Sequence, residues 1–317
     1  MGKTAILFPG QGAQTVGMLA DVAADGAAHG RPQAALAARA VFDRANAVLG
    51  FDLAEVCFAG PQERLNATDV AQPALFTASV AMWNAMQAAG LADRYKADAA
   101  AGLSLGEYTA LWLAGCFSFE DGLKIVRARG ELMQAAATAA PSGMVSIMGL
   151  DEPTVQDLCG RARRPGEVLA PANFNCPGQI VVSGSAAACE RVLPLAEEAG
   201  GRGVALKVAG AFHSELMRPA AEKLAGVLAA VQMQSPRIPV LSNVTGGYHE
   251  ADPNRIRELL VEQVTSPVRW EQGVRRLLGD GYGRFVEVGP GRVLTGLLRK
   301  IERAAEAVNV SDASGLR

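Results

Sequence analysis

The sequence has few residues of the kinds that bind metals, form disulfides or attract nucleic acid. It contains three histidines, far apart in the chain, and five cysteines with no Cys-x-x-Cys spacing. We therefore predict no metal site and expect the cysteines to be the reduced thiols of a cytoplasmic protein. The formal net charge of 317 residues is −2, so the basic excess typical of nucleic-acid-binding proteins is missing.

Long hydrophobic runs are also missing. Half of the residues are hydrophobic, but no run approaches the roughly 20 apolar residues that a membrane-spanning helix needs. The first residues lead directly into a strand-like run, which predicts no signal peptide. The length and the hydrophobic content are sufficient for a large core, in one large domain and a smaller one.

Strand-like runs alternate with helical patterns, which is typical of an α/β domain with a mainly parallel sheet. Pro73 is expected to open a helix that Gly90 ends, and Gly50 and Gly115 are expected to end two other helices. Strands are predicted over residues 4–8, 97–101, 237–243 and 285–288, the last being the final strand. Helices are predicted over residues 33–49, 73–89, 107–114, 119–139, 214–230 and 253–263.

The segment 142–209 has a different order of elements. Strands are expected over 144–148, 168–173, 179–183 and 203–208, with helices from Asp151 to about Arg163 and from Ala186 to Glu198. The order β-α-β-β-α-β is that of the ferredoxin-like unit. We therefore predict a small subdomain of residues 141–209, inserted into a large subdomain of residues 1–140 and 210–317.

One stretch, Gly102-Leu103-Ser104-Leu105-Gly106, is the only Gly-x-Ser-x-Gly in the chain. In proteins that use this pattern, the serine lies on a sharp strand-to-helix turn and its hydroxyl is exposed as a nucleophile. A serine that only caps a helix in a glycine-rich loop is the structural alternative.

A second glycine-rich loop, 9–14, follows the first strand. It lacks the spacing of a dinucleotide-binding loop, because Thr15 stands where the third glycine is needed. Backbone N–H groups lining a pocket fit this loop better, and a plain tight turn is the alternative.

A serine nucleophile needs a base, and His213 is the preferred candidate. It follows an apolar pair and precedes a predicted helix, whose N-terminus favours the neutral ring. His29 and His249 lie in polar or glycine-rich loops and are expected at the surface. No acidic residue stands at a clear strand end between Ser104 and His213, so a main-chain carbonyl near a helix C-terminus, such as that of Gln263, could orient the base.

Arg127 and Arg129 lie two positions apart on the helix predicted over 119–139. Residues two apart on a helix point to different faces. One arginine can therefore face solvent while the other faces a cleft.

Spaced motifs along nearly the whole chain together resemble the malonyl-CoA:acyl carrier protein transacylase family. The matching stretches are Phe-Pro-Gly-Gln-Gly (8–12), Gln-Pro-Ala-Leu-Phe (72–76), Gly-Leu-Ser-Leu-Gly-Glu-Tyr (102–108), Arg-Ala-Arg-Gly-Glu (127–131), Gly-Ala-Phe-His-Ser (210–214), Glu-Val-Gly-Pro-Gly (287–291), and residues 173–178 and 262–270. The resemblance implies an α/β-hydrolase-like large subdomain with a ferredoxin-like insert, in agreement with the pattern of elements.

The resemblance also implies roles for individual residues. They are Ser104 as the acylated nucleophile, His213 as its base, the Gln263 carbonyl as the group that orients the base, the backbone N–H groups of Gln11 and Leu105 as an oxyanion hole, Arg129 as the partner of the malonyl carboxylate, and Phe212 and Asn173 as substrate-binding residues. The commonest motif has histidine before the serine, whereas this chain has Leu103. That neighbour is not the base, so the difference does not affect the predicted chemistry.

The implied reaction moves a malonyl group from malonyl-CoA to the phosphopantetheine thiol of acyl carrier protein through a seryl ester, for fatty acid synthesis. No separate cofactor is expected, since both substrates carry the phosphopantetheine, and the chain is expected to be a monomer. The alternatives are a serine esterase or thioesterase, which has no use for Arg129 in its pocket, a trans-acting acyltransferase of a polyketide pathway, and a non-enzymatic acyl-binding protein.

Overall fold

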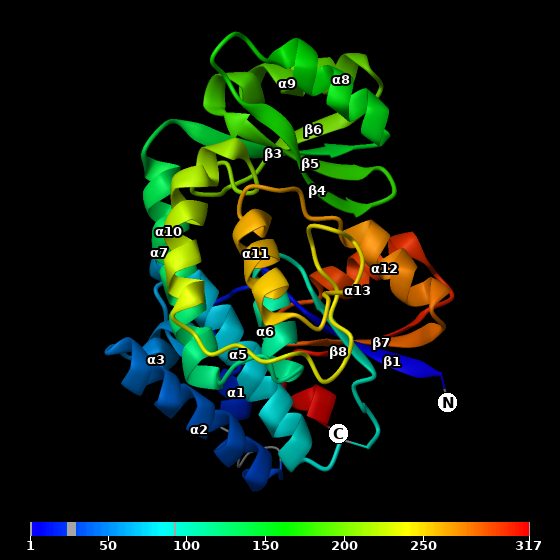
Figure 1. Ribbon diagram of the computed structural model, residues 1–317. Helices are drawn as coiled ribbons and strands as arrows, with labels where there is room; N and C mark the ends of the chain where they lie inside the picture. Colours follow the sequence, from blue (N-terminus) through cyan, green and yellow to red (C-terminus); the bar gives the residue numbers. More distant parts are fainter. Residues whose placement is uncertain (1, 24–29, 92, 317) are drawn as a thin grey trace.

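Two separate β-sheets organise the computed structural model, which describes residues 2–23, 30–91 and 93–316 (Figure 1). The first sheet is parallel throughout and has the order β2-β1-β7-β8. Its strands are β1 (Lys3–Phe8), β2 (Ala99–Gly102), β7 (Tyr282–Val288) and β8 (Glu306–Val310). The predicted α/β class with a mainly parallel sheet is confirmed.

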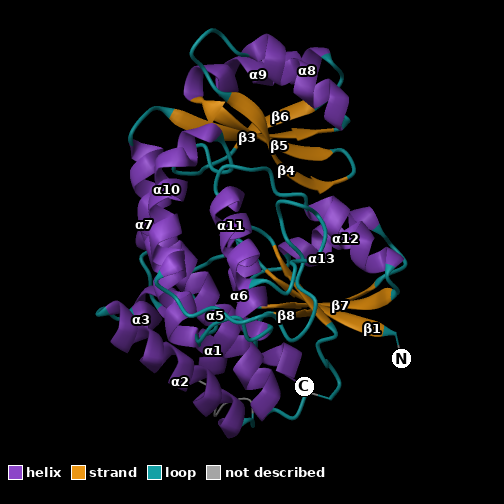
Figure 2. Ribbon diagram, viewed as in Figure 1, coloured by secondary structure: helices purple, strands orange, loops and turns teal. Residues whose placement is uncertain are grey.

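Helices cover both faces of this sheet (Figure 2). Side chains of β1 alternate between two cores, Ile6 and Phe8 in one, Ala5 and Leu7 in the other. The first core packs against α2 (Pro32–Leu49), α5 (Thr68–Ala88), α6 (Leu105–Leu113), α7 (Phe119–Thr138), α10 (Arg218–Ala229) and α11 (Pro253–Gln263). The second packs against α12 (Trp270–Gly279) and α13 (Val293–Ile301). Short helices are α1 (Ala20–Ala23), α3 (Leu53–Phe58), α4 (Gln62–Asn66), and the 3-10 helices η2 (Glu215–Met217) and η3 (Ala313–Leu316).

The second sheet is antiparallel, has the order β4-β5-β3-β6, and lies at the top of Figure 1. Its strands are β3 (Ser142–Met148), β4 (Leu169–Cys176), β5 (Gln179–Ser185) and β6 (Arg202–Ala205). One face is covered by α8 (Glu152–Ala162) and α9 (Ala186–Glu198), with a core of its own. This is the ferredoxin-like topology that the sequence predicts. The subdomain limits at 140/141 and 209/210 stay a prediction.

Several predicted elements differ in the structure. The helix predicted from Pro73 begins at Thr68, because Gln134 of α7 accepts a hydrogen bond from the Thr68 N–H. The strand predicted over 237–243 is reduced to single bridges such as that between Ala100 and Val240, next to Pro239, which cannot donate to a sheet.

Further elements follow β7, which the sequence predicts to be the final strand. Both α13 and β8 come after β7, and α12 precedes it in a stretch for which no element was predicted. The helix predicted over 214–230 is divided into η2 and α10. Among the residues described, no helix is both long and apolar enough to cross a bilayer.

Candidate active site

Ser104 lies on the turn between β2 and α6, in a backbone conformation that non-glycine residues rarely adopt (φ 53°, ψ −103°). The turn is possible because its neighbours are glycines. A Cβ on Gly102 would lie 1.9 Å from the carbonyl carbon of Gly106, and one on Gly106 would lie 2.1 Å from the Phe8 oxygen. The three alanines of β2 are poor strand formers, but they are completely buried and let the layers approach closely.

His213 reaches the serine from the loop before η2. Its Nε2 lies 2.8 Å from Ser104 Oγ, and its Nδ1 lies 2.8 Å from the backbone oxygen of Gln263, the last residue of α11. A carbonyl oxygen only accepts hydrogen bonds, so Nδ1 carries the ring hydrogen. Nε2 is therefore free to accept the hydroxyl proton of Ser104.

The pKa of His213 is lowered to about 4, chiefly because the ring is buried and secondly because of the nearby Arg129 cation. The sequence predicts that the N-terminus of a long helix favours the neutral His213 ring, but no long helix begins at this residue. Only the single turn of η2 follows the histidine, and α10 begins five residues later at Arg218. The neutral ring that a base requires is thus favoured by burial and a neighbouring charge.

Arg129 extends from α7 to the same hydroxyl and is only 1% exposed. Its Nη2 donates to Ser104 Oγ and to Gln263 Oε1, both at 3.0 Å, and its Nη1 donates to Gln72 Oε1 at 2.8 Å. Its Nε has no acceptor among the described residues. The cation is therefore buried with neutral hydrogen-bond partners only.

Arg127 occupies the opposite face of the same helix. It donates to Glu131 and to the backbone oxygen of Leu49, and its side chain is partly exposed. The different environments of the two arginines confirm the prediction from their spacing.

A cleft of about 440 Å³ surrounds the serine and lies between the two sheets. Its lining includes Gln11, Asn173 and Phe212 together with Ser104, Arg129 and His213. Within the described residues, the backbone N–H groups of Gln11 and Leu105 have no hydrogen-bond acceptor. That of Leu105 is the first of α6, where helical N–H groups lack intrahelical partners.

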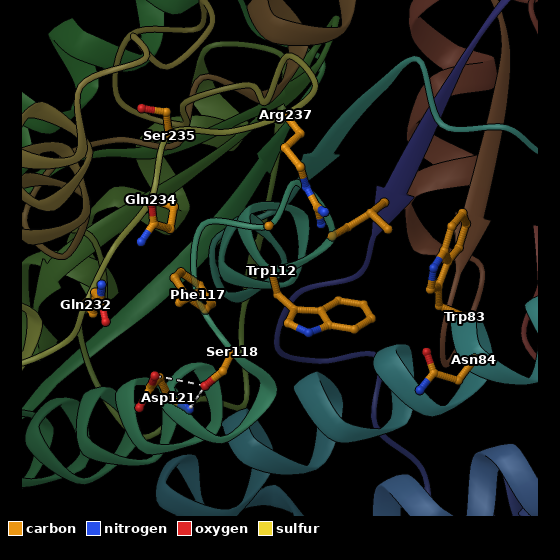
Figure 3. A pocket seen from close by; sticks show the side chains of 12 residues that line it. Trp83, Asn84, Trp112, Phe117, Ser118, Asp121, Gln232, Gln234, Ser235 and Arg237 are labelled. Carbon is orange, nitrogen blue, oxygen red and sulfur yellow. Dashed lines mark hydrogen bonds between the residues drawn. The ribbon is translucent and has the colours of Figure 1, made fainter.

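A second hollow, of about 760 Å³, opens at the other end of α6 and is drawn in Figure 3. Trp83, Trp112 and Arg237 line it, with Ser118 and Asp121 at one side (Figure 3). Ser118 is the N-cap of α7 and has no histidine beside it in this lining. The hollow is larger than the cleft, but the Ser118 hydroxyl donates to the carboxylate of Asp121 and no histidine is among the lining residues.

Sequence reasoning missed two buried polar residues next to the serine. Glu107 is fully buried, and His249, which was expected at the surface, has a completely buried side chain with Nε2 2.6 Å from Glu107 Oε1. The prediction for His249 was wrong because a polar-looking loop folds over the only carboxylate of α6. Glu107 is the single acidic residue of the mostly apolar helix α6, and this was the sequence signal for a buried polar contact. His29 lies outside the described residues.

Neither cysteines nor metal-ligand clusters add to the site. All five thiols are buried and unpaired. In the described part of the chain, no group of three or more His, Cys, Asp or Glu side chains could hold a metal ion.

Comparison with known proteins gives consistent matches over the full length. The model of the acyl transferase domain matches residues 6–315. A malonyl CoA-acyl carrier protein transacylase of Bacillus subtilis is 41% identical over 98% of this chain and 94% of its own. An acyl carrier protein S-malonyltransferase of Vibrio cholerae has a TM-score of 0.90 at 43% identity, over 99% of this chain and 98% of that one. A malonyl transacylase solved in complex with its type II polyketide-synthase acyl carrier protein, PlMCAT with AntF, also has a TM-score of 0.90, at 38% identity over 99% and 97% of the two chains.

Proposed function

Because the chain belongs to the malonyl-CoA:acyl carrier protein transacylase family, we propose that Ser104 carries the malonyl group as an ester between two thiol substrates. The chain is an acyltransferase that moves malonyl groups from malonyl-CoA to acyl carrier protein. One observation carries the assignment of residues: the hydroxyl of Ser104 lies within hydrogen-bond distance of both a neutral histidine and a buried arginine.

The first half-reaction forms the ester. Ser104 Oγ attacks the thioester carbonyl of malonyl-CoA while His213 Nε2 takes the hydroxyl proton. The negative charge on the tetrahedral oxygen is stabilised by the free N–H groups of Gln11 and Leu105. The C–S bond then breaks, and His213 returns the proton to the sulfur of CoA.

The second half-reaction is the same chemistry in reverse. The phosphopantetheine thiol of acyl carrier protein attacks the seryl ester, His213 takes the thiol proton, and the Ser104 oxygen recovers it as the C–O bond breaks. The Gln263 carbonyl holds the His213 ring through both steps. No group beyond the two substrates is needed.

Arg129 selects the acyl group. Its Nε and Nη2 form one edge of the guanidinium. Nε has no acceptor among the described residues, and Nη2 donates to Ser104 Oγ, a hydrogen bond that an incoming carboxylate can replace. A carboxylate can accept two parallel hydrogen bonds from such an edge. We therefore assign to Arg129 the free carboxylate of malonyl, with Asn173 and Phe212 on the cleft wall around the rest of the group.

The test is intact-protein mass spectrometry. Malonyl-CoA should add one malonyl mass to the protein, and acyl carrier protein with its phosphopantetheine should remove that mass and gain it. A serine hydrolase would instead release free malonate without carrier protein. Carrier proteins from fatty acid and polyketide pathways, compared side by side, distinguish the proposed fatty acid role from the polyketide role suggested by the PlMCAT complex. We also propose that the protein is a cytoplasmic monomer and that the inserted subdomain spans residues 141–209.

Acylation should persist at acidic pH because the pKa of His213 is lowered to about 4. A histidine with the ordinary pKa of about 6.5 is only about 3% neutral at pH 5, whereas this one remains mostly neutral there. Ser104 acylation should therefore lose little of its kcat/KM between pH 7.5 and pH 5, since this ratio reports the free enzyme. A roughly thirty-fold loss over this range would contradict the lowered pKa.

The same pKa shift affects stability with a definite sign. Between pH 6.5 and about 4 the unfolded chain binds a proton at His213 that the folded chain does not. This residue therefore lowers the free energy of unfolding as the pH falls through that window, and its contribution is complete below about 4. Rates at pH 5 must accordingly be measured below the melting temperature at that pH.

Phe212 should make the site selective against a branched acyl group. The ring is buried at the cleft wall directly before the base. It should crowd a methyl group on the malonyl α-carbon, so malonyl-CoA should be preferred over methylmalonyl-CoA, on the order of 10- to 200-fold. Phe212→Ser should narrow this gap. Equal transfer rates for both substrates in the unmodified protein would refute this role.

A further inference from the structure

Four buried polar side chains, which we call the Glu107 cluster, lie around the turn that carries Ser104. They are Glu107 of α6, Gln263 of α11, and Asn243 and His249 of the loops between α10 and α11. Glu107 Oε2 accepts hydrogen bonds from Gln263 Nε2 at 2.6 Å and from the Asn243 N–H at 3.1 Å, and its Oε1 lies 2.6 Å from His249 Nε2. Glu107 is therefore the common acceptor of the cluster.

The Glu107 cluster forms hydrogen bonds with both the N–H and the carbonyl oxygen of Ser104. Asn243 Oδ1 accepts from the Ser104 N–H at 2.6 Å, and Gln263 Nε2 donates to the Ser104 oxygen at 3.0 Å. Both holding residues are themselves bonded to Glu107. A backbone at φ 53° and ψ −103° persists only where its surroundings fix it. These hydrogen bonds supply that constraint.

Gln263 connects the same carboxylate to the base and to the arginine. Its amide nitrogen faces Glu107, so its Oε1 faces Arg129 Nη2 at 3.0 Å, while its backbone oxygen accepts from His213 Nδ1. A carboxylate only accepts hydrogen bonds, and this fixes which way round the Gln263 amide lies. The reversed amide would point a donor at the arginine.

His249 supplies the hydrogen-bond donor for Glu107 Oε1. A carboxylate oxygen only accepts hydrogen bonds, so His249 Nε2 carries a hydrogen and donates it to Glu107 Oε1, while Nδ1 has no partner among the described residues. Without this donor, Glu107 Oε1 would be buried and unpaired, and the carboxylate could rotate to seek another donor.

We propose that Glu107 and His249 are positioning residues for the transfer reaction, which fix the turn of Ser104 and the orientation of Gln263 and thereby align nucleophile, base and arginine. Neither residue reaches the cleft lining, so they act through Ser104 and Gln263 rather than on the substrate. The inference rests on the proposed function of Ser104.

The experiment measures single-turnover acylation of Ser104 by malonyl-CoA in His249→Leu and His249→Gln. Leucine removes the donor, whereas glutamine keeps an N–H donor on a side chain of similar reach. His249→Leu should lower the acylation rate at saturating malonyl-CoA by on the order of 10- to 100-fold, the usual effect of misplacing a catalytic group. His249→Gln should recover most of that loss.

The matched control is Glu287→Gln. Glu287 is a buried carboxylate like Glu107, but it accepts from the N–H groups of Leu294 and Thr295 at the start of α13. This substitution should lower the melting temperature and leave the saturating acylation rate of the folded protein unchanged. It separates loss of stability from loss of alignment.

The outcomes separate this inference from the function it rests on. An unmodified protein that gains no malonyl adduct on Ser104 would overturn the proposed function. An acylated wild type together with a folded His249→Leu variant at the wild-type saturating rate would overturn the positioning role alone.

Should His249→Leu not fold, Glu107→Gln answers the same question. The amide that replaces the carboxylate can satisfy His249 and Gln263 together only if the His249 ring moves its hydrogen to Nδ1 or the Gln263 amide turns over. With three histidines in the chain, ¹⁵N ring signals identify this change directly. We expect altered His249 or His213 ring signals and acylation slowed on the order of tenfold. Unchanged signals with a wild-type rate would contradict the proposal.

Discussion

Ser104→Ala should abolish the malonyl adduct completely while leaving the fold intact. The hydroxyl is the only group that the proposed ester uses, and it lies 2.8 Å from the His213 base. Removing one oxygen from the turn should disturb the protein little, because the turn is fixed through the backbone of Ser104 by Asn243 and Gln263. The measurement is intact mass after incubation with malonyl-CoA, followed by peptide mapping and a thermal melt.

His213→Ala is the informative companion variant. It keeps the nucleophile but removes the group that takes its proton, so acylation should slow by about 10²–10⁴-fold without being abolished. The Gln263 oxygen also loses its ring N–H partner, which an added imidazole could replace. A malonyl adduct that maps to any residue other than Ser104, or that forms at an undiminished rate in Ser104→Ala, would exclude Ser104 as the nucleophile.

The sequence predicts the parts of this site that depend on local pattern. The strained serine turn follows from the glycines at 102 and 106, and the different faces of Arg127 and Arg129 follow from helical geometry. The absence of a suitable acidic residue after Ser104 suggests a carbonyl behind the base, and His213 Nδ1 indeed faces the Gln263 oxygen. In each case, a short stretch of chain carries the necessary information.

Contacts between distant segments are the parts that the sequence does not predict. His249 and Glu107 are 142 positions apart, and nothing in the local sequence of either indicates their pairing. The pKa of His213 likewise depends on burial and on Arg129, which come from the packing of several elements rather than from a neighbouring helix. The start of α5 at Thr68 is similarly fixed by Gln134 of another helix.

Arg129→Ala should lower malonyl transfer strongly and leave acetyl transfer unchanged or faster. In the wild type the guanidinium is buried, has only neutral hydrogen-bond partners, and offers an unpaired Nε. A malonyl carboxylate placed there without a cation would be a buried, unpaired charge. Losing one partner of a buried charge pair typically costs about 2–5 kcal/mol, or roughly 30- to several thousand-fold in rate. An acetyl group carries no charge, so its transfer rate should not fall in this way.

The variants that complete this test differ in charge and shape. Arg129→Lys should rescue malonyl transfer only partly, because a point charge does not reproduce two parallel hydrogen bonds. Arg127→Ala removes a cation from the partly exposed face of the same helix and should transfer malonyl at about the wild-type rate. Malonyl and acetyl transfer to carrier protein should be measured side by side for all three. Equal losses for both acyl groups in Arg129→Ala would show that the arginine serves the Ser104 and Gln263 hydrogen bonds alone, and selection of the carboxylated group would then have to come from another part of the cleft.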